Sequence, residues 1–251
     1  MRMIETSRSG ACVTLLINRP ERRNALNNVM YRQLEDSLQA AQADASCSAI
    51  ILTGAQGYFT SGNDVSEFRG ARSVEDSPAL SFLRTLASID VPVVAAVEGA
   101  AIGVGVTLLQ HCDFVYAGDT ATFAMPFVSL GLSPEGGSSL LLAQLVGARR
   151  AAEWLLLGKP FSAQEAQDSG FITQAVPAGM ALEHATNTAH ALTAQPAQAL
   201  REAKKILQES QRAALGHAFD REKTLFGRRL VSDEAQAAFA SFLSKRKAPE
   251  A

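Results

Sequence analysis

The sequence contains little cysteine and tryptophan, and neither sign of charge is in large excess. Of its 251 residues, three are cysteine and one is tryptophan, and the formal net charge is −2. Cys12, Cys47 and Cys112 are odd in number and far apart, so we expect buried, reduced thiols rather than a disulfide framework. The near-neutral charge provides no basic surface for nucleic acid or for an anionic membrane.

Long apolar runs are also missing. No run approaches the roughly 18 residues of a membrane span, and the N-terminal segment MRMIETSRSG lacks the apolar stretch of a signal peptide. The C-terminal KRKAPEA does not contain a peroxisomal tripeptide. We therefore expect a cytoplasmic protein without a membrane partner. Apolar residues make up 47% of the chain and charged residues 19%, which excludes a disordered, collagen-like or coiled-coil protein.

Short apolar runs alternate with helical patterns over the first two thirds of the chain. The patterns predict strands at residues 12–18, 49–53, 92–97, 113–117 and 122–125, and helices at 27–43 and 78–88. The glycine-rich segments 54–70 and 99–105 are predicted to be turns, the second leading into a helix at 106–112. This order indicates an α/β core.

The sequence from Gly136 onward is predicted to be almost wholly helical, with breaks at Gly147, residues 158–160, Pro177 and Pro196. Segments 197–208 and 233–247 are amphipathic and need an apolar surface, either their own core or a neighbouring subunit. We assign residues 1–195 to the α/β core and 196–251 to a helical C-terminal region of the same functional unit.

Three segments are candidates for chemistry. The first, YFTSGNDVSEF at residues 58–68, contains a turn in which Gly62 permits a conformation that presents backbone N–H groups; taken alone, the segment is interpreted as a plain surface turn. The second, EGAAIGVGVT at 98–107, joins an apolar run to a helix start, where free N–H groups form an anion site. A dinucleotide fingerprint is disfavoured there, because Leu108 stands where a third glycine is needed.

The third segment, LGLSPEGGSS at residues 130–139, contains Glu135 just before two glycines and a helix. The alternative interpretation is a first-turn glutamate that suits the helix dipole. It is not a nucleophile elbow, because Ser133 is followed by proline and glutamate. We expect no metal site at His111, since the other histidines lie far away in the chain.

Together these segments resemble the crotonase superfamily, the enoyl-CoA hydratase and isomerase family. The resemblance is carried by INRPERRNALN at 17–27, TSGNDVSEF at 60–68, the stretch 92–139 and FLSKRKA near the end. It implies a spiral of ββα units, a helical C-terminal trimerisation region, and homo-oligomers that are trimers or dimers of trimers. It also implies an acyl-CoA thioester substrate, with coenzyme A entering as part of the substrate and no separate cofactor, and a role in fatty acid metabolism of the β-oxidation type.

The resemblance implies that the backbone amides of Asn63 and Val104 stabilise an enolate of the thioester. Fixed amide dipoles suit this role because they need no reorganisation when the negative charge develops. Hydratases of the family carry two glutamates, and the matching positions here are Thr107 and Phe127, neither of which can act as a base toward water. The single carboxylate instead stands at Glu135, as in the peroxisomal-type 3,2-enoyl-CoA isomerases.

The sequence therefore predicts an enzyme that moves the double bond of a 3-enoyl-CoA to the 2-trans position, with Glu135 carrying the proton. Phe127 is interpreted as a wall of the acyl pocket. The resemblance further implies coenzyme A contacts at Arg22, Arg23, Ala25, Ser61, Gly62 and Asp64, although both arginines are equally read as ordinary surface charge. The alternatives are hydration, another crotonase reaction, or a non-catalytic relative that binds acyl-CoA or RNA.

Overall fold

Two β-sheets form the framework of the molecule, and the computed structural model describes residues 3–68 and 77–245 of the chain. The larger sheet has the strand order β1-β2-β3-β4-β6-β9, and the smaller has the order β5-β7-β8. In the larger sheet β1 and β2 form an antiparallel hairpin and the other strands run parallel. The strands are β1 (Ile4–Ser9), β2 (Cys12–Ile17), β3 (Ala49–Gly54), β4 (Val93–Val97), β5 (Ala100–Ile102), β6 (Phe114–Gly118), β7 (Thr122–Ala124), β8 (Phe161–Ser162) and β9 (Gln174–Val176).

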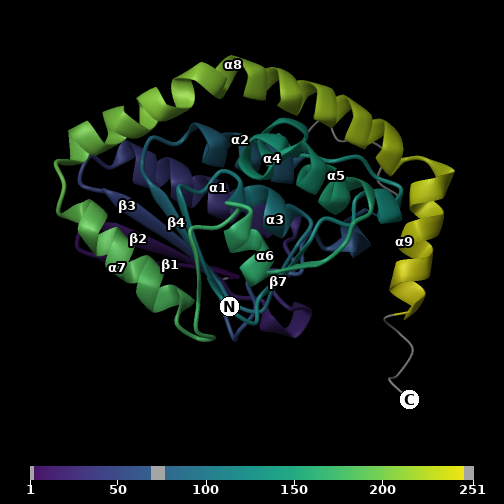
Figure 1. Cartoon of the computed structure of the whole chain (residues 1–251), viewed down its shortest axis with the longest axis horizontal. Helices are drawn as coiled ribbons and strands as arrows, with labels where there is room; N and C mark the ends of the chain where they lie inside the picture. The colour runs from purple at the N-terminus through teal and green to yellow at the C-terminus, as the bar shows by residue number, and fades with distance from the viewer. Residues whose placement is uncertain (1–2, 69–76, 246–251) are drawn as a thin grey trace.

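Helices cover both faces of the larger sheet and connect the two sheets (Figure 1). The α-helices are α1 (Asn28–Ala43), α2 (Pro78–Ser88), α3 (Val104–Leu109), α4 (Ser138–Val146), α5 (Ala148–Leu156), α6 (Ala163–Asp168), α7 (Ala181–Thr193), α8 (Ala197–Leu230) and α9 (Asp233–Lys245). Three short 3₁₀ turns occur at η1 (Pro20–Arg22), η2 (Val65–Glu67) and η3 (Val128–Leu130). No helix in the described residues has both the length and the apolar character that crossing a bilayer requires.

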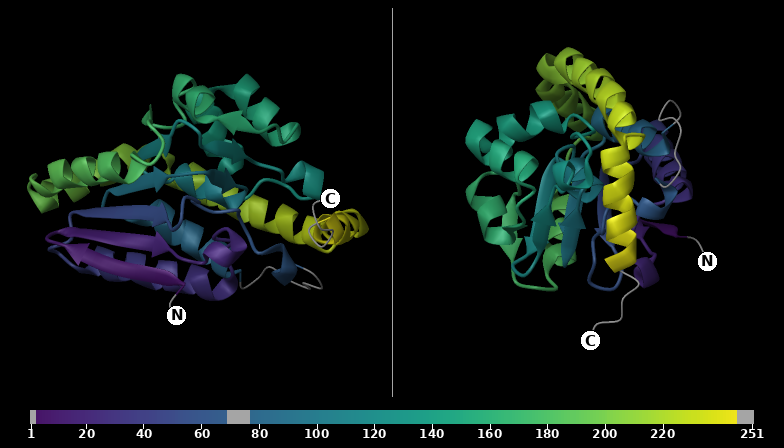
Figure 2. Two further views of the ribbon diagram at one scale, coloured as in Figure 1. Left: turned by 90° about the horizontal axis from the view of Figure 1, so that it is seen from below. Right: turned by 90° about the vertical axis from the view of Figure 1, so that its right-hand side faces the viewer.

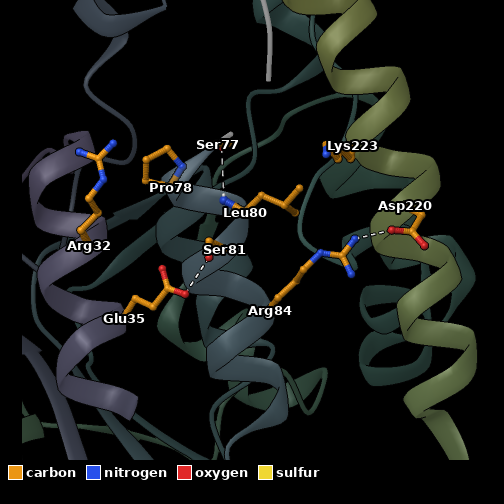
Figure 3. A pocket seen from close by; sticks show the side chains of 9 residues that line it. All are labelled: Arg32, Glu35, Ser77, Pro78, Leu80, Ser81, Arg84, Asp220 and Lys223. Carbon is orange, nitrogen blue, oxygen red and sulfur yellow. Dashed lines mark hydrogen bonds and ion pairs between the residues drawn. The ribbon is translucent and has the colours of Figure 1, made fainter. Parts of the chain in front are cut away.

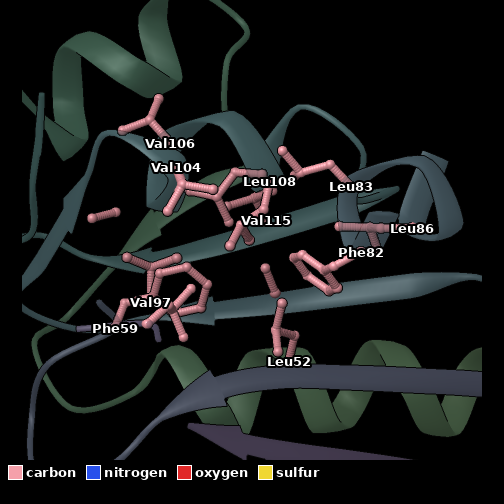
Figure 4. Packing of buried hydrophobic residues seen from close by; sticks show 14 of the residues in the cluster. Leu52, Phe59, Phe82, Leu83, Leu86, Val97, Val104, Val106, Leu108 and Val115 are labelled. Atoms are coloured by element: carbon pink, nitrogen blue, oxygen red, sulfur yellow. The ribbon is translucent and has the colours of Figure 1, made fainter. Parts of the chain in front are cut away.

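The core divides at the larger sheet, because successive side chains of a strand point to opposite faces. On β3, Ile50 and Leu52 join the large cluster that includes Phe82 of α2. Ala49 and Ile51 face the other way, toward a smaller cluster that includes Ala185 of α7. Figure 4 shows the large cluster continuing from Leu52 and Phe82 to Val104 of α3. The helix that begins at Val104 is therefore packed against this large apolar cluster.

Helix α8 extends across the whole molecule, as Figure 1 shows. Near its start, the Arg201 guanidinium donates to backbone carbonyls at the end of α1 and just after it, those of Ala41, Gln42, Asp44 and Cys47. One turn later, buried Lys204 pairs with Asp113 at 2.7 Å. Figure 2 shows that α9 then turns away from α8 and follows the side of the molecule.

The crotonase-like α/β architecture predicted from the sequence is observed, and four local predictions are wrong. Strand β1 was not predicted, because five of its six side chains are exposed and leave no apolar alternation. The turn predicted at 99–105 contains β5, and the helix after it begins at Val104 rather than at residue 106. The almost wholly helical region contains β8 and β9, which have two and three residues and are too short for a period-two signal. The helix predicted at 197–208 continues to Leu230.

Candidate active site

The first element of the site is the turn that ends at Asn63. Gly62 has φ +91°, and a Cβ there would lie 2.7 Å from the carbonyl oxygen of Ile102, so only glycine fits without displacing a backbone. The Gly62 amide donates to the Thr60 hydroxyl at 3.1 Å. Among the described residues, no group accepts a hydrogen bond from the backbone N–H of Asn63.

The second element is the start of α3. Gly103 precedes it with φ +56°, and the Val104 N–H, in the first turn of the helix, also has no acceptor in the described part of the chain. An isolated parallel bridge pairs Thr60 with Ala101. The Ile102 amide donates to the Thr60 carbonyl at 3.1 Å, so the segments that lead to Asn63 and to Val104 lie side by side. Two unsatisfied backbone donors thus lie on neighbouring segments, which is an arrangement that can stabilise an oxyanion.

The third element is Glu135, in the loop between η3 and α4. Gly136 and Gly137 follow it with φ +68° and +83°, and a Cβ on Gly136 would lie 2.4 Å from the Thr107 side chain of α3. The loop is therefore packed directly on the helix that carries Val104. Partial burial and the negative charge of Glu222 raise the pKa of Glu135 to about 7, although Asn63 opposes this by donating a hydrogen bond.

A line of side chains joins the base to the core. The Asn63 Nδ2 lies 3.4 Å from Oε1 of Glu135, and the Tyr31 hydroxyl donates to Oδ1 of the same amide. Burial first, and then the charge of Glu135, raise the pKa of Tyr31 well above its usual value, so its hydroxyl keeps its proton. Tyr31 therefore fixes the orientation of the amide, with the NH₂ group toward Glu135. Asn63 therefore contributes to the site in two ways: its side chain contacts Glu135, and its backbone amide has no acceptor among the described residues.

Sequence reasoning missed Tyr31, although a signal was available. Tyr31 follows Met30 on the buried face of α1, where the helix otherwise buries apolar side chains. A buried tyrosine hydroxyl needs a hydrogen-bond partner, so a tyrosine on such a face indicates a polar contact inside the protein.

The two positions predicted from the resemblance to match the glutamates of hydratases are filled by buried side chains. Thr107 is fully buried, and its hydroxyl lies 3.3 Å from the Gly103 carbonyl and 3.4 Å from the Ser138 hydroxyl. Phe127 is 4% exposed and joins the large apolar cluster. Neither side chain can accept a proton from water.

The residues predicted to contact coenzyme A gather at one place. Arg22 and Arg23 are both exposed. The Ser61 hydroxyl donates to the Arg22 carbonyl at 3.2 Å and the Ser61 amide donates to the Arg23 carbonyl at 3.0 Å. Two exposed cations therefore lie beside the turn that carries Gly62 and Asn63.

Asp64 and Ala25 have other partners, which the sequence did not reveal. Arg19 donates to the Asp64 carboxylate at 2.8 Å and to the Ala25 carbonyl at 3.1 Å. Asp64 also accepts hydrogen bonds from Ser66 at the start of η2 and has a lowered pKa, with hydrogen bonds from Ser66 and Arg19 outweighing its burial. The observed role of Asp64 is thus to hold the turn in shape.

A hollow of about 530 Å³ lies on the outer side of α2, between α1 and α8 (Figure 3). Arg84 crosses part of it to pair with Asp220, while Glu35 accepts a hydrogen bond from Ser81. Its lining residues are Arg32, Glu35, Ser77, Pro78, Leu80, Ser81, Arg84, Asp220 and Lys223. None of the predicted site residues is among them, so this hollow is separate from the Glu135 site.

Comparison with known proteins gives one consistent family. The family model described as enoyl-CoA hydratase/isomerase matches residues 7–249. The chain is 34% identical to 2,3-dehydroadipyl-CoA hydratase of Escherichia coli over 243 residues, which covers 96% of this chain and 95% of the relative. It is also 34% identical to human enoyl-CoA delta isomerase 2 over 253 residues, covering 97% of this chain and 64% of that longer protein.

Solved structures give the same result for the fold. The structure of OdaA from Pseudomonas aeruginosa superimposes with a TM-score of 0.94 and 38% identity, covering 97% of this chain and 99% of that one. An enoyl-CoA hydratase/isomerase from Pseudoalteromonas atlantica superimposes with a TM-score of 0.92 and 32% identity, covering 100% of both chains. The family model and the shared crotonase fold agree, and the chain belongs to the enoyl-CoA hydratase/isomerase family.

Proposed function

We propose that this protein is an isomerase that moves the double bond of a 3-enoyl-CoA to the 2-trans position. The observation that carries the proposal is the Glu135 carboxylate beside the Asn63 side chain, where the backbone amides of Asn63 and Val104 have no acceptor in the described residues. Thr107 and Phe127, at the positions that the resemblance matches to the glutamates of hydratases, provide no second carboxylate. A proton shuttle needs one base, whereas water addition needs a base for the water and an acid for the α-carbon.

In the proposed reaction, the Glu135 carboxylate removes a proton from the α-carbon of the thioester. The electron pair released from that C–H bond spreads over the thioester oxygen and the neighbouring double bond, which gives a dienolate. The backbone amides of Asn63 and Val104 donate to the negative oxygen. Protonated Glu135 then returns the proton to the γ-carbon, and the double bond is left conjugated with the thioester.

The electrostatics of Glu135 support this role. A pKa of about 7 gives a base that is partly ionised at neutral pH and that both takes and returns a proton readily. The Asn63 amide donates to one carboxylate oxygen, so the other is the oxygen that we assign to the substrate. Arg22 and Arg23, exposed beside the same turn, are proposed to meet the phosphates of coenzyme A.

Hydration is the competing reaction, because the hydratase and the isomerase among the relatives are equally similar to this chain. Two assays of the unmodified protein separate the reactions. Incubation with 3-hexenoyl-CoA is expected to produce the absorbance of a conjugated enoyl thioester. Incubation with crotonyl-CoA is expected to leave that absorbance nearly unchanged. Fast loss of crotonyl-CoA absorbance, at a rate that rivals isomerisation, would require the function to be renamed hydratase.

We also propose that the chain assembles as a trimer or a dimer of trimers. The C-terminal helices support this less than expected, because Phe219, Phe226 and Phe239 are buried within their own chain. The surface that remains apolar includes Ile206 and Leu207 of α8, which are 69% and 78% exposed. Sedimentation at micromolar concentration is expected to show an oligomer, and a monomer alone would refute the proposal.

A further inference from the structure

Glu222 is a buried carboxylate for which the proposed reaction has no direct use. It lies on the inner face of α8 between Phe219 and Phe226 and is 3% exposed. Within residues 3–68 and 77–245, no lysine, arginine or histidine nitrogen approaches it within 4.0 Å. A buried carboxylate without a cation is costly unless other donors satisfy it.

The donors are two backbone amides at the start of α4. The Gly137 amide donates to Oε2 of Glu222 at 2.6 Å, and the Ser139 amide donates to Oε1 at 2.8 Å. Both oxygens act as acceptors, which is the pattern of an ionised carboxylate. The positive end of the α4 dipole adds to the stabilisation. Glu222 of α8 thereby accepts hydrogen bonds from two free backbone N–H groups at the start of α4, the helix that begins three residues after Glu135.

A second side chain, from the turn after α3 rather than from α8, holds the same loop. His111, two residues after α3, has Nε2 2.8 Å from the Gly136 carbonyl, and its ring stacks on Phe219 of α8. Burial lowers the pKa of His111 to about 4, so the neutral ring donates its Nε2 proton to that carbonyl at working pH. The two residues that follow the base are thus held on both sides.

We infer that Glu222 is a positioning residue for Glu135: it holds the backbone that carries the base, and its negative charge acts on the base through the protein interior. The inference rests on the proposed role of Glu135 as a base and holds for any crotonase reaction in which it is one. Burial raises the pKa of Glu135, and the negative charge of Glu222 raises it further.

Several other charged or titratable groups lie near this pair; among them, Lys204 of α8 acts on His111, and Glu67 of η2 acts on Tyr31. Tyr31 of α1 contacts Asn63, and His111, two residues after α3, contacts the loop. Arg84 of α2 lies over the Phe219 ring at 5.0 Å and pairs with Asp220 of α8, while Lys223 lines the hollow outside α2. Because Tyr31 stays protonated and His111 stays neutral over the working range, neither hides a change in the Glu135 titration.

The test compares Glu222→Gln with Asp220→Asn, which removes a carboxylate from the same helix at an exposed position. Glu222→Gln keeps the size of the side chain but offers one acceptor oxygen to two amides. We expect it to lower kcat for 3-hexenoyl-CoA about tenfold with little change in KM, and to lower the midpoint of the kcat–pH profile by about one unit. Asp220→Asn is expected to leave both close to their original values.

A titration that does not depend on turnover keeps this inference separate from the proposed function. The Glu135 carboxyl is followed by carbon NMR in glutamate-labelled protein and identified by its absence in Glu135→Gln. Glu222→Gln is expected to lower the titration midpoint even if 3-hexenoyl-CoA is not the substrate. A midpoint equal to those of the unmodified protein and Asp220→Asn would overturn the inference, as a simple helix cap changes thermal stability alone.

Glu222→Asp covers the case in which the glutamine variant does not fold. Aspartate keeps the charge but shortens the side chain, so it cannot reach both amides. We expect kcat to fall several-fold while the midpoint of the pH profile stays near its original value. An unchanged kcat in this variant would show that Glu222 does not position the base.

Discussion

The two halves of the candidate site, the pair of amides and the base, are held in place by different means. The amides of Asn63 and Val104 are positioned by backbone: the positive φ of Gly62, the parallel bridge at Thr60 and the start of α3. Glu135 is positioned by side chains from two helices and from the turn after α3, namely Tyr31 acting through Asn63, Glu222 and His111. The backbone half depends on two short segments of sequence, and the side-chain half depends on residues scattered over almost two hundred positions.

The most severe test of the side-chain half is Glu135→Gln. Glutamine keeps the shape of the side chain but cannot take the proton, so kcat for 3-hexenoyl-CoA is expected to fall at least about 100-fold. Binding of a saturated acyl-CoA, measured by calorimetry, is expected to change little. Normal isomerisation by this variant would show that another group is the base.

The backbone half is tested by Gly62→Ala against the matched control Gly57→Ala. Both glycines have positive φ, +91° and +74°, but only at Gly62 would the new Cβ meet a backbone atom, whereas nothing lies within 4 Å at Gly57. Displacement of the Asn63 amide is expected to lower kcat about 100-fold in Gly62→Ala. The control shares the backbone strain, and its kcat is expected to stay within about threefold. Equal losses in the two variants would mean that strain alone, rather than the amide position, is responsible.

Glu135 also makes the fold sensitive to pH. Its pKa is raised from 4.5 to about 7 on folding, so the folded protein binds the proton more tightly than the unfolded chain does. Stability is therefore lost as pH rises from about 4.5 to about 7, and the loss is complete above that range. We expect the free energy of unfolding of Glu135→Gln at pH 8 to be about 2 kcal/mol higher than that of the unmodified protein, a value reduced because the side chain is only partly buried. The difference is expected to vanish near pH 4, as checked by urea unfolding at both values.

Tyr31→Phe is expected to have the smallest effect of the four. Without the tyrosine hydroxyl the Asn63 amide is free to turn, and Glu135 loses the hydrogen bond that lowers its pKa. We expect kcat to fall about tenfold and the pH profile to move to higher pH, opposite to the shift expected for Glu222→Gln. Tyr58→Phe, at a position 39% exposed, is the control. If the midpoint of the pH profile of Tyr31→Phe does not move, Tyr31 does not act on Glu135.

What the sequence predicts well is what is encoded locally. Strands β2, β3 and β4 and helices α1 and α2 were predicted to within about two residues, because each is a buried run or an amphipathic period several residues long. Asn63, Val104 and Glu135 were identified as candidates, since each lies in a glycine-bearing segment that resembles the family.

The contacts that orient Glu135 could not be predicted in the same way. Glu222 contacts the loop from a helix that crosses the molecule, and His111 contacts it from the turn after α3. No spacing in the sequence shows which turn of α8 meets Gly137. Only a weak signal exists, in that Glu222 interrupts the buried stripe formed by Ala218, Phe219 and Phe226. A lone charge on such a stripe indicates a buried partner without saying which one.

The contact of Arg201 with the carbonyls that end α1 has a consequence for protein synthesis. Those carbonyls, up to that of Cys47, leave the ribosome about 150 residues before the arginine that binds them. At ordinary rates of translation this interval lasts roughly 10–30 s, during which only water satisfies that end of the helix. The end of α1 is therefore satisfied from within the protein only after residue 201 has been made, and a nascent chain that stalls before it presents an unfinished helix end to chaperones and proteases.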